Sequence, residues 1–348
     1  MKKILFIFCL ALASLRLSAV EAETAKFTVA PGEKVSLPLN YVRTDVELKA
    51  SLTFKKFQSA RIGCGAEAYT GGWMDVTNKD ITPYKLNLKK AKPNEKRQLD
   101  TIRMMEPFWH GVKIKKELNV TIRSRNGSAN VLVESQGREE ESTVNGWWAG
   151  GAPFVINTGT EPFDVELSFT RLKADEPVWF YGDSYFSTLN QNRWPYYMYK
   201  AGYKKWMADH IPGGGTKALL ECFKNDLKFG TPKYAVWMLG MNDGSDKEGK
   251  PTSGWLKGIK EFISICESKG ITPILTTIPT VPARFHDCKT EWVRNSGCRY
   301  IDWYEAVGSD SKGNWKEGYL SNDKVHPTKE GAAALWKQVK KDLPELEK

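Results

Sequence analysis

The pattern of apolar and polar residues changes about half-way along the chain. From about Glu23 to Leu172, apolar and polar residues alternate with a period of two in several short segments separated by Gly, Asn, Pro and Lys. "VELKASLTF" and "FDVELSFTRL" are two such segments, and no stretch there keeps a helical period. Short strands between turn residues predict an antiparallel β-sandwich of jelly-roll type, as an accessory domain over residues 23–174.

After "KADEP" (173–177), short apolar runs alternate with amphipathic helical segments such as "TKALLECFKNDL" and "SGWLKGIKEFISICESKG". Such alternation predicts an α/β domain with a parallel sheet covered on both faces, over residues 175–348. In these folds, ligands bind at the carboxyl ends of the strands. The expected strands are Val178–Tyr181, Tyr234–Leu239, Thr272–Thr277 and Arg299–Trp303.

The first 22 residues have the pattern of an export signal. Lys2 and Lys3 precede an apolar run from Ile4 to Leu15, and small residues follow up to Ala22. Arg16 interrupts the run before the ~20 residues that a membrane span needs. We therefore expect cleavage near Ala22, export to the periplasm or medium, and no stable insertion into a membrane.

The formal net charge is +10 at pH 7. The basic residues are spread along the chain, which favours a solvated basic surface. No helix-turn-helix, zinc-finger or RNA-binding signature is present, so a nucleic-acid partner is not expected.

The cysteines offer one candidate disulfide. Cys288 and Cys298 bracket a short segment and are the expected pair in an oxidising compartment. Cys222 and Cys266 fall on apolar faces of expected helices and are interpreted as core thiols. No CxxC motif or Cys/His spacing suits zinc, so no metal is expected.

Four motifs lie at expected strand ends of the second half: Gly182-Asp183-Ser184, Gly213–Gly215, Gly240-x-Asn242-Asp243, and Asp323-x-x-His326. In this order, they resemble the SGNH (GDSL-type) hydrolase family over about residues 177–345. The resemblance implies a three-layer, flavodoxin-like catalytic domain and a hydrolase without a cofactor.

The chemistry of these residues agrees with that resemblance. Ser184 becomes a nucleophile only when a base takes its proton. Of the four histidines, His326 alone has a carboxylate, Asp323, three residues before it, able to orient the ring. The alternative is that His326 merely caps the last helix. Asp183 and Asp243 are interpreted as loop-stabilising residues.

The resemblance also implies three donors for an oxyanion. They are the backbone N–H of Ser184, a glycine N–H from residues 213–215, and the side-chain amide of Asn242. Gly214 is the expected glycine because Thr216 matches a threonine common in the family, although a shift of one residue stays open. The glycines are equally consistent with a flexible turn before a helix. No G-x-S-x-G or H-E-x-x-H motif offers another site.

Two aromatic groups are open to two interpretations. Trp194 follows the nucleophile loop, and Trp147 and Trp148 lie in the first domain. Each could stack on a sugar ring or belong to a core or domain interface.

These observations predict an exported serine esterase that removes an acyl group, acetyl above all, from a polysaccharide or oligosaccharide. A lipase, thioesterase or lysophospholipase with the same catalytic residues is the alternative within this chemistry. A carbohydrate-binding protein with an inactive hydrolase domain is the alternative from another class.

Overall fold

The computed structural model describes residues 22–39, 45–65, 71–88, 99–109, 113–125, 127–147 and 150–347. Residues 1–21 of the expected export signal lie outside this part, as does Trp148. No helix in the described ranges is long and apolar enough to cross a membrane.

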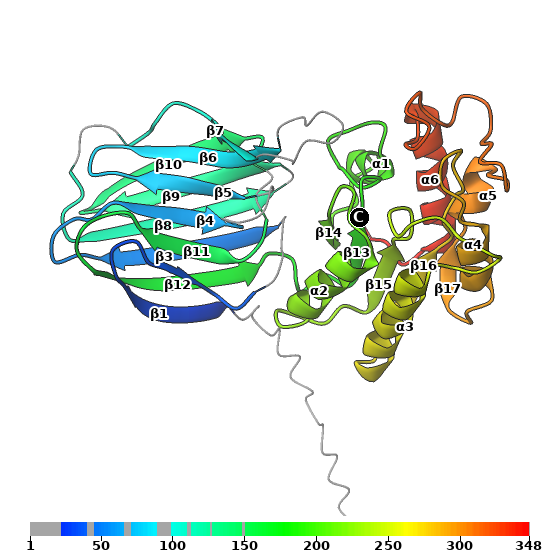
Figure 1. The fold of residues 1–348 in the computed structure, drawn as a ribbon, viewed down its shortest axis with the longest axis horizontal. Coiled ribbons are helices and arrows are strands. Elements are labelled where there is room, and N and C mark those ends of the chain that lie inside the picture. Colours follow the sequence, from blue (N-terminus) through cyan, green and yellow to red (C-terminus); the bar gives the residue numbers. More distant parts are fainter. Residues whose placement is uncertain are drawn as a thin grey trace, which may run out of the picture.

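The first half forms two six-stranded antiparallel sheets, one with the order β1-β12-β3-β8-β9-β10 and the other with the order β2-β11-β4-β5-β6-β7 (Figure 1). Along the chain, strands β1 to β4 alternate between the two sheets, and so do strands β10 to β12. This is a jelly-roll arrangement. The predicted β-sandwich is confirmed. Its strands are β1 (Glu23–Val29), β2 (Lys34–Ser36), β3 (Val46–Thr53), β4 (Ala60–Cys64), β5 (Gly72–Val76), β6 (Ile81–Leu88), β7 (Leu99–Arg103), β8 (Glu117–Arg125), β9 (Ser128–Ser135), β10 (Arg138–Asn145), β11 (Pro153–Asn157) and β12 (Phe163–Arg171).

Alternation along each strand places the core between the two sheets. In β12, Phe163, Val165, Leu167 and Phe169 are buried, whereas the residues between them are exposed or half-buried. A period of two puts every second side chain on the same face, so the apolar set of β12 faces the other sheet.

The second half contains a five-stranded parallel sheet with the order β14-β13-β15-β16-β17. Numbered within this sheet, the order is 2-1-3-4-5, as in flavodoxin-like folds, which confirms the predicted class. The four expected strands end within two residues of the observed ones. The strands and helices are β13 (Val178–Gly182), α1 (Trp194–Lys200), β14 (Met207–His210), α2 (Thr216–Asp226), β15 (Tyr234–Met238), α3 (Ser253–Ser268), β16 (Thr272–Thr276), α4 (Asp287–Arg294), β17 (Arg299–Ile301), α5 (Trp303–Val307) and α6 (Lys329–Asp342).

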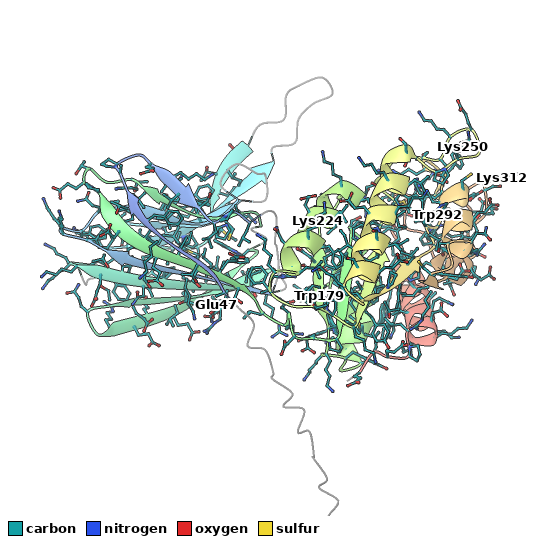
Figure 2. The ribbon with its side chains drawn as sticks, turned by 90° about the horizontal axis from the view of Figure 1, so that it is seen from below. Glu47, Trp179, Lys224, Lys250, Trp292 and Lys312 are labelled. Atoms are coloured by element: carbon teal, nitrogen blue, oxygen red, sulfur yellow. The ribbon has the colours of Figure 1, made fainter. Side chains whose placement is uncertain are left out.

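Helices cover both faces of the parallel sheet. Phe180 packs edge-on against Trp194 of α1, and its neighbour Tyr181 packs against Phe223 of α2. Because consecutive strand residues point to opposite faces, α1 and α2 lie on opposite sides of β13. Helix α6 packs beside α1, and α3 packs beside α2. Trp179, labelled in Figure 2, is fully buried on β13.

A buried ion pair joins the sandwich to the α/β domain. Arg171, the last residue of β12, places its Nε 2.9 Å from Oδ1 of Asp226 at the end of α2, and both side chains are fully buried. Arg171 also donates to the carbonyl oxygen of Ala208 on β14 at 3.2 Å, and Tyr181 donates to Asp226 at 2.8 Å. The chain therefore leaves the sandwich through a packed, charged junction.

Candidate active site

Three residues from distant parts of the chain meet at the carboxyl edge of the parallel sheet. Ser184 follows the end of β13, while Asp323 and His326 lie in the loop before α6. Nε2 of His326 is 2.8 Å from Oγ of Ser184, and Nδ1 of His326 is 2.7 Å from Oδ2 of Asp323. An ionised carboxylate only accepts hydrogen bonds, so the proton sits on Nδ1. Nε2 is then free to accept the hydroxyl proton of Ser184.

Asp323 is held as a carboxylate by its own loop. Its Oδ1 accepts from the backbone N–H groups of Val325 and His326, each at 2.9 Å, and from the hydroxyl of Ser321 at 2.8 Å. Partial burial raises the pKa of Asp323, but the hydrogen bonds from His326 and its neighbours outweigh this effect and hold that pKa well below its usual range. The charge that orients His326 is therefore present across the working pH range.

The alternative role for His326, capping the last helix, is wrong. The side chain of Thr328 caps α6 instead, by accepting from the N–H of Gly331 at 3.2 Å. His326 is thereby left to face the nucleophile.

Tyr185, which the motif analysis did not single out, ties the nucleophile loop to the histidine loop. Its hydroxyl donates to the carbonyl oxygen of Val325 at 2.5 Å, and its ring lies 6.4 Å from that of Trp303. Because Tyr185 directly follows Ser184 and Val325 directly precedes His326, this bond sets the two reacting side chains at a fixed separation. The signal was present as an aromatic residue after the nucleophile, but its partner was not deducible.

Asn242 lies in the loop after β15, beside the nucleophile. Its Nδ2 donates to Oδ2 of Asp183 at 3.1 Å and to the carbonyl oxygen of Gly214 at 3.2 Å. Asp183 also accepts from the N–H of Tyr185 at 3.0 Å. Burial raises the pKa of Asp183 to about 7. These contacts stabilise the loop, as expected for Asp183. One of them is with the side-chain amide of Asn242, which is also an expected donor to the oxyanion.

The glycine turn before α2 corrects one expectation. The N–H of Gly214 donates to the carbonyl oxygen of Ile211 at 2.7 Å, so Gly214 as an oxyanion donor is wrong for this conformation. The N–H of Gly214 is therefore already bonded within a tight turn. The turn leaves no room for a side chain at this position, because a Cβ would lie 2.7 Å from Cβ of Ile211. Within the described residues, the N–H groups of Gly213 and Gly215 have no acceptor. Asp243 stabilises the turn by accepting from the N–H and the hydroxyl of Thr216.

Two cations that sequence reasoning missed support the Asn242 loop. Nη1 of Arg284 donates to Oδ1 of Asn242 at 3.0 Å. The fully buried Lys289 donates to the carbonyl oxygen of Gly244 at 2.5 Å and pairs with Asp246 at 3.0 Å. The sequence carried no signal for either role, because both residues lie in a segment far from the four motifs.

Trp194 and Trp147 do not face substrate. Trp194 is fully buried and stacks on Trp336 of α6 at 6.3 Å, and Trp147 is 2% exposed. The predicted sugar contact of Trp194 is therefore wrong: its ring fills the layer between β13 and α6. The interpretation of these tryptophans as core residues is the correct one.

The other histidines of the described part, His210 and His286, are both buried. His210 is buried and stacks on Phe186, and burial lowers the pKa of His286 to about 3. Cys222 and Cys266 are buried, as expected of core thiols. Cys288 and Cys298 are both free, so the predicted disulfide is wrong; one lies at the start of α4 and the other just before β17.

In the described part, no group of three or more His, Cys, Asp or Glu side chains is arranged to hold a metal ion. Ser184 follows the first strand of the 2-1-3-4-5 sheet, and His326, in contact with it, precedes the last helix. The second domain has the fold of the SGNH hydrolases.

Comparison with known proteins gives matches among solved structures. Neither a scan against protein-family models nor a search of curated proteins found a match. Among solved structures, the SGNH domain is similar to hydrolases that each align with about half of this chain. They include a GDSL-like lipase from Bacteroides thetaiotaomicron (19% identity, 50% of this chain, 90% of that chain, TM-score 0.39), a lipase/acylhydrolase from Enterococcus faecalis (18%, 49%, 96%, 0.37) and an acetyl xylan esterase (18%, 48%, 98%, 0.39).

Proposed function

We propose that the protein is a serine esterase that hydrolyses a carboxylic ester through an acyl-enzyme. One observation carries this proposal: His326 contacts both Asp323 and Ser184 at the carboxyl edge of the sheet. Its Nδ1 lies 2.7 Å from Oδ2 of Asp323, and its Nε2 lies 2.8 Å from Oγ of Ser184. This edge is where open α/β folds bind ligands. The three residues have the roles that hydrolysis by a serine nucleophile requires.

The reaction follows from the positions of the protons. Oγ of Ser184 attacks the ester carbonyl while Nε2 of His326 takes the hydroxyl proton, and Asp323 stabilises the imidazolium that forms. The tetrahedral intermediate collapses when His326 gives that proton to the departing alcohol. Water then attacks the acyl-enzyme with His326 again as base, which releases the acid and restores Ser184.

The oxyanion of the intermediate needs donors that point at it. The N–H of Ser184 and the amide of Asn242 serve this role, and Asn242 exchanges its 3.2 Å bond to Gly214 for the oxyanion. Either Gly213 or Gly215 supplies the third donor, since both amides lack an acceptor among the described residues. Each such donor contributes about 10²- to 10³-fold to the rate.

We propose an acetyl ester on a carbohydrate as the substrate. A long acyl chain needs a continuous apolar surface. The described part exposes four large hydrophobic side chains, Ile102, Leu189, Tyr199 and Phe285, and the two that lie together, Leu189 and Tyr199, share one pocket with charged and polar residues. This favours a short acyl group over the lipase alternative. Trp194 and Trp147 are buried, so they give no support for a sugar substrate. The proposal that the ester is carried by a carbohydrate rests instead on the interdomain pocket described in the next subsection.

The test is hydrolysis of 4-nitrophenyl acetate by the wild type, Ser184→Ala and His326→Ala. We expect each substitution to lower kcat by at least about 10³-fold, because the residues act as one unit. Equal rates for wild type and Ser184→Ala would disprove the nucleophile assignment. No turnover by any of them would favour the carbohydrate-binding alternative. A higher kcat/KM for octanoyl than for acetyl esters would contradict the short-acyl proposal.

We also propose that the mature chain is exported and starts near Glu23, after cleavage of the N-terminal signal. N-terminal sequencing of the protein from the periplasm or medium tests this. An intact Met1 on the protein from those fractions would contradict cleavage.

A further inference from the structure

A pocket of about 790 Å³ lies between the sandwich and the SGNH domain. Its size is within the usual range for sites that bind small molecules or oligomer segments. The sandwich contributes Arg125, Ser128 and Asn145 to its lining, and the SGNH domain contributes Leu189, Tyr199 and Lys204. Neither domain forms this pocket alone.

The topology brings these segments to one edge. Val46 of β3 pairs with Arg171, where the chain leaves the sandwich, and with Ser124 of β8, so the turn between β8 and β9 faces the SGNH domain. Opposite this turn lies the loop that follows the nucleophile, because Leu189 is five residues after Ser184. The pocket wall and the nucleophile therefore belong to one loop.

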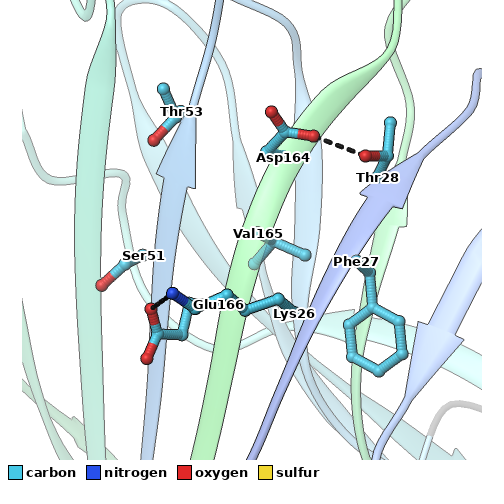
Figure 3. A pocket seen from close by; sticks show the side chains of 8 residues that line it. All are labelled: Lys26, Phe27, Thr28, Ser51, Thr53, Asp164, Val165 and Glu166. Atoms are coloured by element: carbon cyan, nitrogen blue, oxygen red, sulfur yellow. Dashed lines mark hydrogen bonds and ion pairs between the residues drawn. The ribbon is translucent and has the colours of Figure 1, made fainter.

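The charge of this pocket differs from that of the other described depressions. Among the described residues, its lining has two cations, Arg125 and Lys204, and no carboxylate. By contrast, the depression on β1, β12 and β3 contains Asp164 and Glu166, which bond across strands to Thr28 and Lys26 (Figure 3).

A third depression, over β8, β9 and β10, is lined by Glu117, Glu134 and Glu139 together with Arg138. Arg125 is itself paired with Asp45, whose Oδ1 lies 3.4 Å from Nε of Arg125 and whose side chain is 7% exposed. Because this carboxylate is buried, the charged groups that the described lining presents to a ligand are the two cations.

The same pocket gathers apolar surface that is rare elsewhere. Leu189 is 61% exposed and Tyr199 is 45% exposed, and they are two of the four exposed large hydrophobic residues of the described part. A sugar ring has a face of C–H groups that packs on such side chains, while Ser128 and Asn145 offer hydrogen bonds to hydroxyl groups.

Cations, neutral polar groups and an aromatic ring together match a sugar that carries a carboxylate. We propose that this interdomain pocket binds an acidic oligosaccharide, a segment of uronic-acid type belonging to the polymer whose ester is cleaved at Ser184. This inference rests on the proposed esterase function and names its substrate class. It assigns the sandwich a role as one wall of the substrate site.

The direct test is binding of oligogalacturonides and oligoglucuronides to the full chain with Ser184→Ala, measured by isothermal titration calorimetry. Arg125→Gln/Lys204→Gln removes both cations of the pocket. Lys250→Gln/Lys312→Gln is the matched control, because these exposed lysines lie at the far end of the SGNH domain (Figure 2).

We expect the pocket variant to bind about 5- to 20-fold more weakly and the control to bind like its parent, since two exposed ion pairs are lost. Raising the salt concentration should weaken binding to the parent more than to the pocket variant. Tyr199→Ala should weaken binding without changing this salt dependence.

Three results would overturn the inference. They are no binding of either acidic oligosaccharide, equal affinity for neutral xylo-oligosaccharides, and equal losses in the pocket and control variants. Turnover of 4-nitrophenyl acetate, measured on the same substitutions with Ser184 intact, reports on the esterase proposal and on folding separately. If the wild type binds acidic oligosaccharide but cleaves no ester, the esterase proposal fails and the pocket assignment stands.

Discussion

Replacing Arg284 with methionine removes a charged donor from the amide of Asn242 and keeps an unbranched side chain. Nη1 of Arg284 lies 3.0 Å from Oδ1 of Asn242 and 3.5 Å from the carbonyl oxygen of Met241. With Oδ1 held there, Nδ2 points toward Asp183 and Gly214, on the side of the nucleophile. Without Arg284, the amide can rotate and offer its oxygen where the oxyanion needs a donor.

The size of the effect follows from these contacts. Loss of an oxyanion donor lowers kcat by about 10²- to 10³-fold, which sets the upper limit. A hydrogen bond to a charged group contributes about 1.5–3 kcal/mol, and this is the free energy by which Arg284 holds the productive orientation. We therefore expect Arg284→Met to lower kcat for 4-nitrophenyl acetate by roughly 10- to 100-fold. KM should change little, because the amide acts mainly in the transition state.

A double-mutant cycle distinguishes this role from a general structural one. Arg284→Met, Asn242→Ala and the double variant are compared with wild type by kcat, and Arg284→Lys tests whether charge alone suffices. If Arg284 acts through Asn242, the double variant should be no slower than Asn242→Ala. Losses that multiply, or an unchanged kcat for Arg284→Met, would refute the reasoning.

Three further predictions concern buried groups. Arg171→Met leaves Asp226 as a buried charge and should lower the free energy of unfolding in urea by about 3–5 kcal/mol; a loss below about 1 kcal/mol would contradict this. Burial raises the pKa of Asp183 to about 7, so Asp183 loses its proton at a lower pH in the unfolded state than in the folded state. The stability of the wild type therefore falls as the pH rises from about 4 to 7. Asp183→Asn lacks this fall, so Tm of wild type minus Tm of the variant should be larger at low than at high pH; a constant difference argues against it. Gly240 has φ +146°, and a Cβ there would lie 2.7 Å from Cγ1 of Ile278. Gly240→Ala should therefore lower both Tm and kcat. A Tm and kcat equal to those of the wild type would exclude strain in this loop.

Much of the SGNH domain was predictable because its buried strands are continuous apolar runs. The strand at Val178 and the three that follow were located to within two residues for this reason. Strand β14 was missed: Met207–His210 has four residues, too few to show a period, and it forms a strand because β13 lies beside it. Ser184, Asp323 and His326 could be singled out because motif order and local spacing are properties of the chain itself, and the structure brings them into contact.

The errors share a different cause. Gly214 was the expected donor, but its N–H is used by a turn whose acceptor, Ile211, no motif identifies. Sugar contact was one of two interpretations of Trp194, but contacts with α6, more than 130 residues later, bury it. A side chain's exposure depends on what packs over it, and local sequence does not contain that information.

The sequence by itself determined which residues can react and that they lie at strand ends. A serine after a buried strand and an Asp-x-x-His loop before a helix restrict the chemistry whatever their surroundings. The tertiary structure decided what surrounds them. It bonds Tyr185 to the histidine loop, bonds Arg284 to Asn242, and forms the interdomain pocket that Arg125 lines. These pairings join loops from different strands, so they depend on distances that exist only once the sheet has formed and the two domains have packed together.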